Sequence, residues 1–154
     1  MPTLRSDWHR RLNDVLLDFR FADEAVRRLA DRVRRRPDEH PEYSADRKRF
    51  AAAADALEAT FVVRLFAVFE AALRSYDRAR AGDPERTRPA AVLIGSTGGR
   101  RGLAVPPQIR QRAHEVRRTR NAFAHESDEA TESIGLADAK RRCAQFLARL
   151  PERW

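Results

Sequence analysis

The sequence has little of what stabilises secreted or membrane-spanning proteins. Cys143 is its single cysteine among 154 residues, which excludes an intrachain disulfide and a multi-cysteine metal site. No apolar run approaches the length of a transmembrane helix, and the first residues, MPTLRSDWHRR, lack the apolar core of a signal peptide. We therefore expect a cytoplasmic protein with no membrane partner, in which Cys143 packs as a small apolar residue.

Glycine and β-branched residues are also scarce, whereas Ala, Leu, Arg and Glu are abundant. This composition favours helix over strand. The mean hydropathy of −0.67 is low for a globular protein, but the periodic apolar positions described next argue against disorder. The length fits one domain, residues 1–154, with a core of its own. We predict an all-α fold.

Apolar side chains recur at helical spacing in four main segments, which predicts a bundle of the up-and-down type. The first helix is expected over residues 7–35 and the second over 44–81, with an apolar middle that indicates burial on most sides. A third is expected from Pro106 or Pro107 to about His125, and a fourth from Leu136 to Leu150. The inward positions of the third helix are predicted to be Ile109, Ala113, Val116 and Phe123.

The chain carries more basic than acidic residues. The formal net charge is +8, and Lys48 and Lys140 are the only lysines, so nearly all of the positive charge is arginine. A GC-rich coding sequence explains arginine in place of lysine but not the excess of basic over acidic residues. The excess indicates an anionic partner, most simply nucleic acid.

The connection between the second and third long helices, residues 82–106, is rich in glycine and proline. Its AVLIG segment is either a short strand or an apolar plug. Its GSTGGRRG run is not followed by the Lys-Ser/Thr pair of a phosphate loop. We expect a surface loop whose arginines, Arg100 and Arg101, contact RNA.

The run RRTRNAFAHE gathers three side chains suited to phosphodiester chemistry: Arg120, Asn121 and His125. Arginine carries a permanent charge and a fork of donors that fits phosphate. Histidine has the side-chain pKa nearest neutrality, so it can accept or release a proton. The asparagine can orient either of the other two.

An apolar helix carrying LFAVFEAALRSY, then a helix ending in RNxxxH, then one more helix resembles the HEPN superfamily. Those are small all-helical proteins marked by an arginine, usually a polar residue after it, and a histidine four to six residues later. The resemblance covers most of residues 45–150. It implies a metal-independent endoribonuclease without a cofactor, often the toxin restrained by an antitoxin protein or part of another defence system. It also implies a homodimer in which two motifs face each other; some members are inactive modules that bind RNA, nucleotide or a partner protein.

The resemblance assigns a role to each motif residue. His125 is a general base for the ribose 2′-hydroxyl or an acid for the departing 5′-oxygen, and Arg120 stabilises charge on the scissile phosphate. Asn121 holds the histidine or a phosphate oxygen. The products are a cyclic phosphate and a 5′-hydroxyl end. Arg117 and Arg118 are expected to guide the RNA backbone.

Helix geometry complicates this assignment. Asn121 and His125 are one turn apart, but Arg120 points roughly 140° away from His125 on an ideal helix. Two-fold pairing relieves the difficulty, either by bringing an arginine of one chain to a histidine of the other or by doubling both groups around a cleft. Simpler roles are that His125 caps the helix C-terminus and that Arg120 pairs with Asp128 or Glu129.

Two charged residues interrupt the apolar second helix. Arg64 and Glu70 are expected to form a buried ion pair or to reach the motif helix and support it.

The histidines outside the motif, His9, His40 and His114, lack the spacing of metal ligands. The two tryptophans, Trp8 and Trp154, are predicted to pack rather than to stack on bases.

Overall fold

The computed structural model describes residues 4–45, 47–98, 104–125 and 134–154, without the side chains of residues 44, 45, 47 and 125. Regular structure in these ranges is helical, apart from two isolated bridges, Leu4 with Arg153 and Gly98 with Ala104. The predicted all-α helical bundle is confirmed. No helix in the described ranges is both long and apolar enough to cross a membrane.

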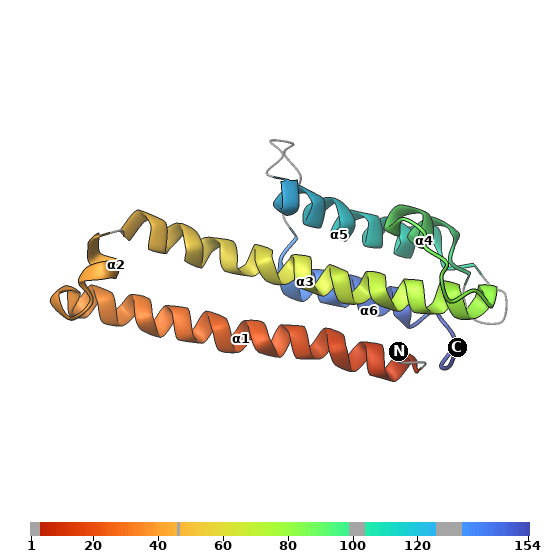
Figure 1. Ribbon diagram of the computed structural model, residues 1–154, viewed down its shortest axis with the longest axis horizontal. Coiled ribbons are helices and arrows are strands. Elements are labelled where there is room, and N and C mark those ends of the chain that lie inside the picture. Colours follow the sequence, from red (N-terminus) through yellow and green to blue (C-terminus); the bar gives the residue numbers. More distant parts are fainter. Residues whose placement is uncertain (1–3, 46, 99–103, 126–133) are drawn as a thin grey trace.

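Two long helices form the frame of the molecule. The first, α1 (Arg5–Arg35), runs antiparallel to α3 (Arg47–Ala81), and the two pack along their length (Figure 1). They are joined by a 3-10 turn, η1 (Pro37–Glu39), and the short helix α2 (Pro41–Ala45). The chain reverses between the two predicted long helices, in the segment that contains Pro37 and Pro41.

The remaining helices cover only one half of this pair. They are α4 (Ala90–Ser96), α5 (Pro107–His125) and α6 (Leu136–Leu147). α6 packs against α1, α3 and α5, and α4 packs against α3 and α5. Figure 1 shows that the other half of α1 and α3 extends beyond α5 and α6 as a two-helix arm. α5 ends on α3 where this arm begins.

The core surrounds the apolar middle of α3, which is the central helix that the composition predicts. Phe66 and Phe69 are fully buried, and Phe69 meets Phe146 of α6 edge to face, with ring centroids 5.5 Å apart. Trp8 is 1% exposed, and Trp154 packs on Tyr76 while its Nε1 donates to Ser75. The expected packing roles of both tryptophans are thus confirmed.

The last helix and the glycine-rich connection differ in detail from expectation. α6 ends at Leu147, although Leu150 beyond it is still buried. AVLIG forms part of α4, not a strand, and Leu93 and Ile94 are its buried residues. The apolar-plug alternative is therefore the correct one, because about two turns of helix are enough to direct two adjacent apolar side chains into the core.

Arg110, near the start of α5, fixes that helix to α4. Its guanidinium donates to the carbonyl oxygens of Ile94 (2.5 Å), Thr97 (2.8 Å) and Val105 (3.0 Å), and also to that of Gly95. These carbonyls lie at the C-terminal end of α4 and just before α5, where backbone acceptors lack helical partners. The Arg110 side chain therefore fixes the start of α5 against the end of α4.

Glu58 of α3 performs a similar task for α6. Its Oε1 accepts a 2.7 Å hydrogen bond from the backbone N–H of Leu136, the first residue of α6. The contact places a carboxylate at the positive end of the helix dipole. α6 follows α5 in the chain. The bond therefore also fixes where α6 begins relative to α3.

Candidate nucleic-acid site at the end of α5

Arg120 and Asn121 form the part of the motif whose side chains the structure describes. Arg120 Nη1 donates a hydrogen bond to Asn121 Oδ1 at 3.0 Å. The Arg120 guanidinium also lies over the ring of Phe66 on α3, 5.7 Å from its centroid, within the range of a cation–π contact. Both motif residues are half-buried. The asparagine therefore orients the arginine, one of the two roles the sequence left open.

His125 is the last residue of α5, and its side chain lies outside the described residues. Helix register still places its backbone one turn beyond Asn121. Arg120 instead packs toward α3, as the wide angle between positions 120 and 125 predicts. The predicted alternative partners of Arg120, Asp128 and Glu129, also lie outside the described residues.

Three arginines near this end of α5 lack the ion pairs that several arginines of α1 form. On α1, Arg27 pairs with Asp23 and Arg28 with Glu24, at one-turn spacing. Arg117, Arg118 and Arg120, here called the α5 arginines, form no ion pair with a described carboxylate. Within the described part of the chain, no ion pair neutralises their charge.

The α5 arginines also keep unused hydrogen-bond donors. The only hydrogen bond that Arg120 donates within the described residues uses one of the five N–H groups of a guanidinium. The Nε atoms of Arg117 and Arg120 are buried and have no partner in the described part of the chain. Arg118 is exposed. An exposed guanidinium such as that of Arg118 suits a phosphate, which brings several acceptor oxygens.

His114 lies on the same side of α5, one turn before Arg117 and Arg118. Burial lowers the pKa of His114 below its usual 6.5, and the positive charges of Arg117, Arg118 and Arg110 lower it further. The imidazole is therefore neutral near pH 7. The three arginine charges thus act on His114 in the same direction as its burial, which is the larger cause.

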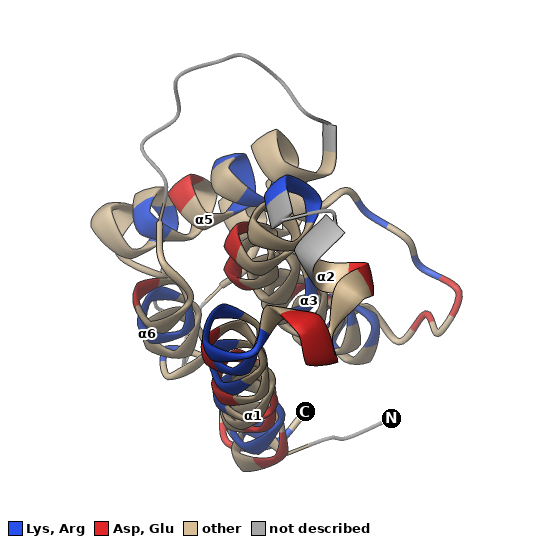
Figure 2. Ribbon diagram, turned by 90° about the vertical axis from the view of Figure 1, so that its left-hand side faces the viewer, with Lys and Arg blue, Asp and Glu red and all other residues tan. Residues whose placement is uncertain are grey.

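Basic residues occur on other helices as well. Figure 2 shows lysine and arginine on α1, α5 and α6, with acidic residues between them. On α6, Arg142 bonds to Asp138 and to Glu115 of α5, and Arg141 pairs with Asp138. The α5 arginines differ from these paired arginines of α6 by having no carboxylate partner within the described residues, and by their place near the motif histidine that ends α5.

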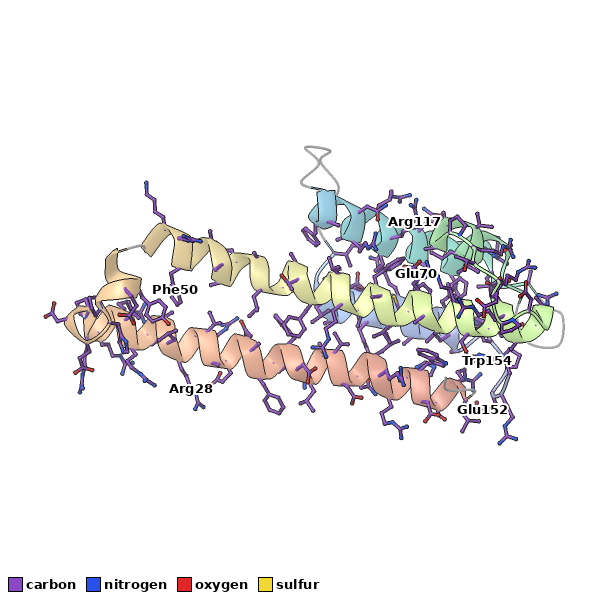
Figure 3. All side chains as sticks on the ribbon, viewed as in Figure 1. Arg28, Phe50, Glu70, Arg117, Glu152 and Trp154 are labelled. Atoms are coloured by element: carbon purple, nitrogen blue, oxygen red, sulfur yellow. The ribbon has the colours of Figure 1, made fainter. Side chains whose placement is uncertain are left out.

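Arg64 and Glu70 do not pair with each other, so the expected buried ion pair is wrong. Arg64 is half-exposed and bonds to Asp18 of α1 at 2.7 Å. Glu70 bonds to Arg74, one turn along α3, at 2.6 Å. Six residues on a helix separate two side chains by about 120°, which directs Arg64 and Glu70 to different neighbours. Figure 3 shows Glu70 between α3 and α5, near the helix that carries Arg117.

Phe123 is not the core residue that its periodicity predicts. It is 37% exposed and lines an open groove of about 550 Å³ between the end of α5 and the arm half of α3. The core beneath α5 ends before Phe123 because the last turn of α5 lies on α3 where the arm begins. No signal in a single sequence marks where a helix overhangs its neighbours.

Two further expectations concern the connection and metals. Arg100 and Arg101 lie outside the described residues. Within the described ranges, no group of three or more His, Cys, Asp or Glu side chains is arranged to hold a metal ion.

Comparison of the chain with protein-family models, with curated proteins and with solved structures finds no match.

Proposed function

We propose that this protein is a metal-independent endoribonuclease of the HEPN type, with a toxin or defence role and an antitoxin protein as its restraining partner. The observation that carries the proposal is that Arg120, held by Asn121, is one of three arginines without a described carboxylate partner at the end of α5. These residues stand beside the histidine that ends the helix. Together they supply anion binding and proton transfer in one place.

The reaction follows from the chemistry of those groups. The 2′-oxygen of a ribose attacks the adjacent phosphorus, and the bond from phosphorus to the 5′-oxygen breaks. His125 exchanges a proton with the reacting oxygens, while Arg120 neutralises the charge that builds on the phosphate. The 2′-hydroxyl loses one proton and the 5′-oxygen gains one, so a 2′,3′-cyclic phosphate and a 5′-hydroxyl result. Arg117 and Arg118 bind neighbouring phosphates.

A homodimer completes the site in this proposal. Arg120 packs toward α3 of its own chain, whereas position 125 faces another direction on the helix. A two-fold axis near the end of α5 brings the histidine of one copy to the arginine of the other. The scissile phosphate then lies between two chains, and the two sites of a dimer are equivalent.

One observation favours a different function. The half-buried position of Arg120 over Phe66 is also what a structural arginine adopts. The alternative is a catalytically inactive HEPN-like module that binds RNA, a nucleotide or a partner protein. It predicts salt-sensitive RNA binding without turnover.

Cleavage of RNA in the presence of EDTA tests the proposal. We expect the wild-type protein to cut single-stranded RNA and to leave 2′,3′-cyclic phosphate ends. His125→Ala and Arg120→Ala should abolish cutting while the thermal unfolding temperature stays close to that of the wild type. Arg28→Ala, which removes a paired arginine of α1, is the matched control and should cut normally. Equal cleavage by all four proteins would reject the site, and binding without any cleavage would establish the inactive module.

A further inference from the structure

The groove beside the motif has a mostly apolar lining. It is lined on α3 by Asp55, Ala56, Ala59, Thr60 and Val63, and on α5 by Ala122 and Phe123. Its volume of about 550 Å³ is within the range of small-molecule sites. Phe123, 37% exposed, gives the groove an aromatic side chain, and Ala56 and Ala59 add only small methyl groups to its lining.

We infer that this groove binds a nucleobase of the RNA substrate, stacked on Phe123; the inference rests on the proposed function. Aromatic side chains are the common platform for unpaired bases in RNA recognition. Phe123 follows Arg120 by three residues, which makes the two neighbours on the helix surface. A base on Phe123 therefore places its own phosphate within reach of the α5 arginines.

The charges around the groove separate the base from the phosphate. Asp55 contributes a carboxylate to the groove lining, which repels a phosphate and accepts hydrogen bonds from a base. Arg120, one turn before Phe123 on the same helix and without a described carboxylate partner, attracts the phosphate. This division of charge fits a nucleotide better than a purely apolar protein segment.

Asp55 also gives the groove a preference among bases. A carboxylate accepts hydrogen bonds from exocyclic amino groups, which adenine, cytosine and guanine carry. Uracil has no such group. We therefore expect the groove to favour an amino-bearing base over uracil beside the cleaved bond, and Asp55→Ala to reduce that preference.

Binding is the first test, and it uses the His125→Ala protein so that the RNA stays intact. A short oligoadenylate with 2-aminopurine in place of adenine should lose fluorescence when its bases stack in the groove. Phe123→Ala should weaken binding roughly five- to 150-fold, the range for loss of one stacked base, and Phe123→Trp should retain it. Phe21→Ala removes a more exposed phenylalanine on α1 and is the matched control. Equal binding by the Phe123→Ala and Phe21→Ala proteins would overturn the inference.

Cleavage and assembly are the second test, and they separate this inference from the proposed function. Sequenced cleavage products of the active protein should show the base preference, and Phe123→Trp should keep it. Asp55→Ala should remove it with little change in unfolding temperature. If the RNA is never cut but quenching still depends on Phe123, the nuclease proposal fails and the base site stands. If the RNA is cut with no dependence on Phe123 or Asp55, the base site fails alone. If Phe123→Ala instead turns a dimer into a monomer in sedimentation, the groove is a protein interface and the inference is wrong.

Discussion

Arg120 donates a hydrogen bond to the side-chain oxygen of Asn121, the residue next to it in the chain, at 3.0 Å. Adjacent residues on a helix diverge by about 100°, so this contact requires the long arginine side chain to bend toward the short asparagine. The ring of Phe66 supports the guanidinium from α3. The pair explains why an amide beside the arginine is useful: it holds a flexible cation in one position.

Removal of this amide should weaken cleavage more than binding. Asn121→Ala frees Arg120 to adopt other rotamers, and the loss of a hydrogen bond to a charged group corresponds to a roughly ten- to hundred-fold lower single-turnover rate. Asn121→Asp should be worse for RNA affinity, because a carboxylate neutralises Arg120. Single-turnover cleavage and RNA titration separate the two effects. If Asn121→Ala cuts RNA as fast as the wild type, the orienting role is wrong.

Loss of the Glu58 contact should destabilise the fold through α6. Glu58→Ala removes the acceptor for the Leu136 N–H, and we expect a cost of about 1 kcal/mol in the free energy of unfolding, as for other helix caps. Glu42, on the short α2, is a suitable control because Glu42→Ala removes an exposed glutamate from outside the bundle. Urea titrations of both variants measure the difference. Equal midpoints would show that Glu58 contributes nothing to α6.

Arg110 should be among the most important charged residues for stability. Arg110→Ala leaves the carbonyl oxygens of Ile94 and Thr97 without their donor, and we expect a loss of about 3 kcal/mol, given the usual worth of hydrogen bonds to charged groups. Arg112 on the same helix has only a 3.4 Å contact to Gln145, so Arg112→Ala should change stability little. Thermal and chemical unfolding compare the two. The account of how α4 is fixed fails if both variants unfold alike.

Stability should fall as the solution becomes acidic. Burial lowers the pKa of His9 and of His114 below 6.5, and neighbouring positive charges lower both further. Since each histidine binds its proton more weakly in the folded state, the unfolded chain takes up more protons below about pH 6.5. The stability present above that pH is lost as the pH falls through the folded-state pKa values.

The unfolding temperature measured from about pH 7.5 to about pH 5 tests this effect. His114→Gln should flatten the fall, and His9→Gln should flatten it further. Asp138 affects stability at a lower pH than the histidines. A hydrogen bond from Arg142 lowers the pKa of Asp138 below 3.8, and Arg141 lowers it further, whereas burial opposes both effects. The contribution of Asp138 to the free energy of unfolding is lost only near and below pH 4. An unfolding temperature that is constant above pH 5 would contradict the assignment for both histidines.

The helices could be predicted from the sequence because their signals are local. Pro107 opens α5 and Leu136 opens α6, as expected. Cys143 is fully buried, and its pKa is raised by that burial. The apolar spacing that places such residues is a property of one helix alone.

The contacts that build the site could not be predicted, because they depend on how helices are placed against each other. Arg64 forms an ion pair with Asp18 of α1. Glu58 accepts a hydrogen bond from Leu136, which is 78 positions away in the chain. Phe123 has the spacing of a core residue, but α3 does not cover it fully. Periodicity gives the face of a helix, whereas the length over which a neighbour covers that face is a tertiary property.

Subunit complementation tests the central claim, a site shared between two chains, most directly. Arg120→Ala and His125→Ala proteins are each expected to be inactive, so they are mixed, unfolded and refolded together. Each mixed dimer then holds one site with an intact arginine from one chain and an intact histidine from the other. We predict that the mixture recovers about a quarter of the wild-type cleavage rate, since about half of the dimers are mixed and each has one of two sites intact. A mixture as inactive as its components, alongside an active wild-type protein refolded in the same way, would contradict the shared site.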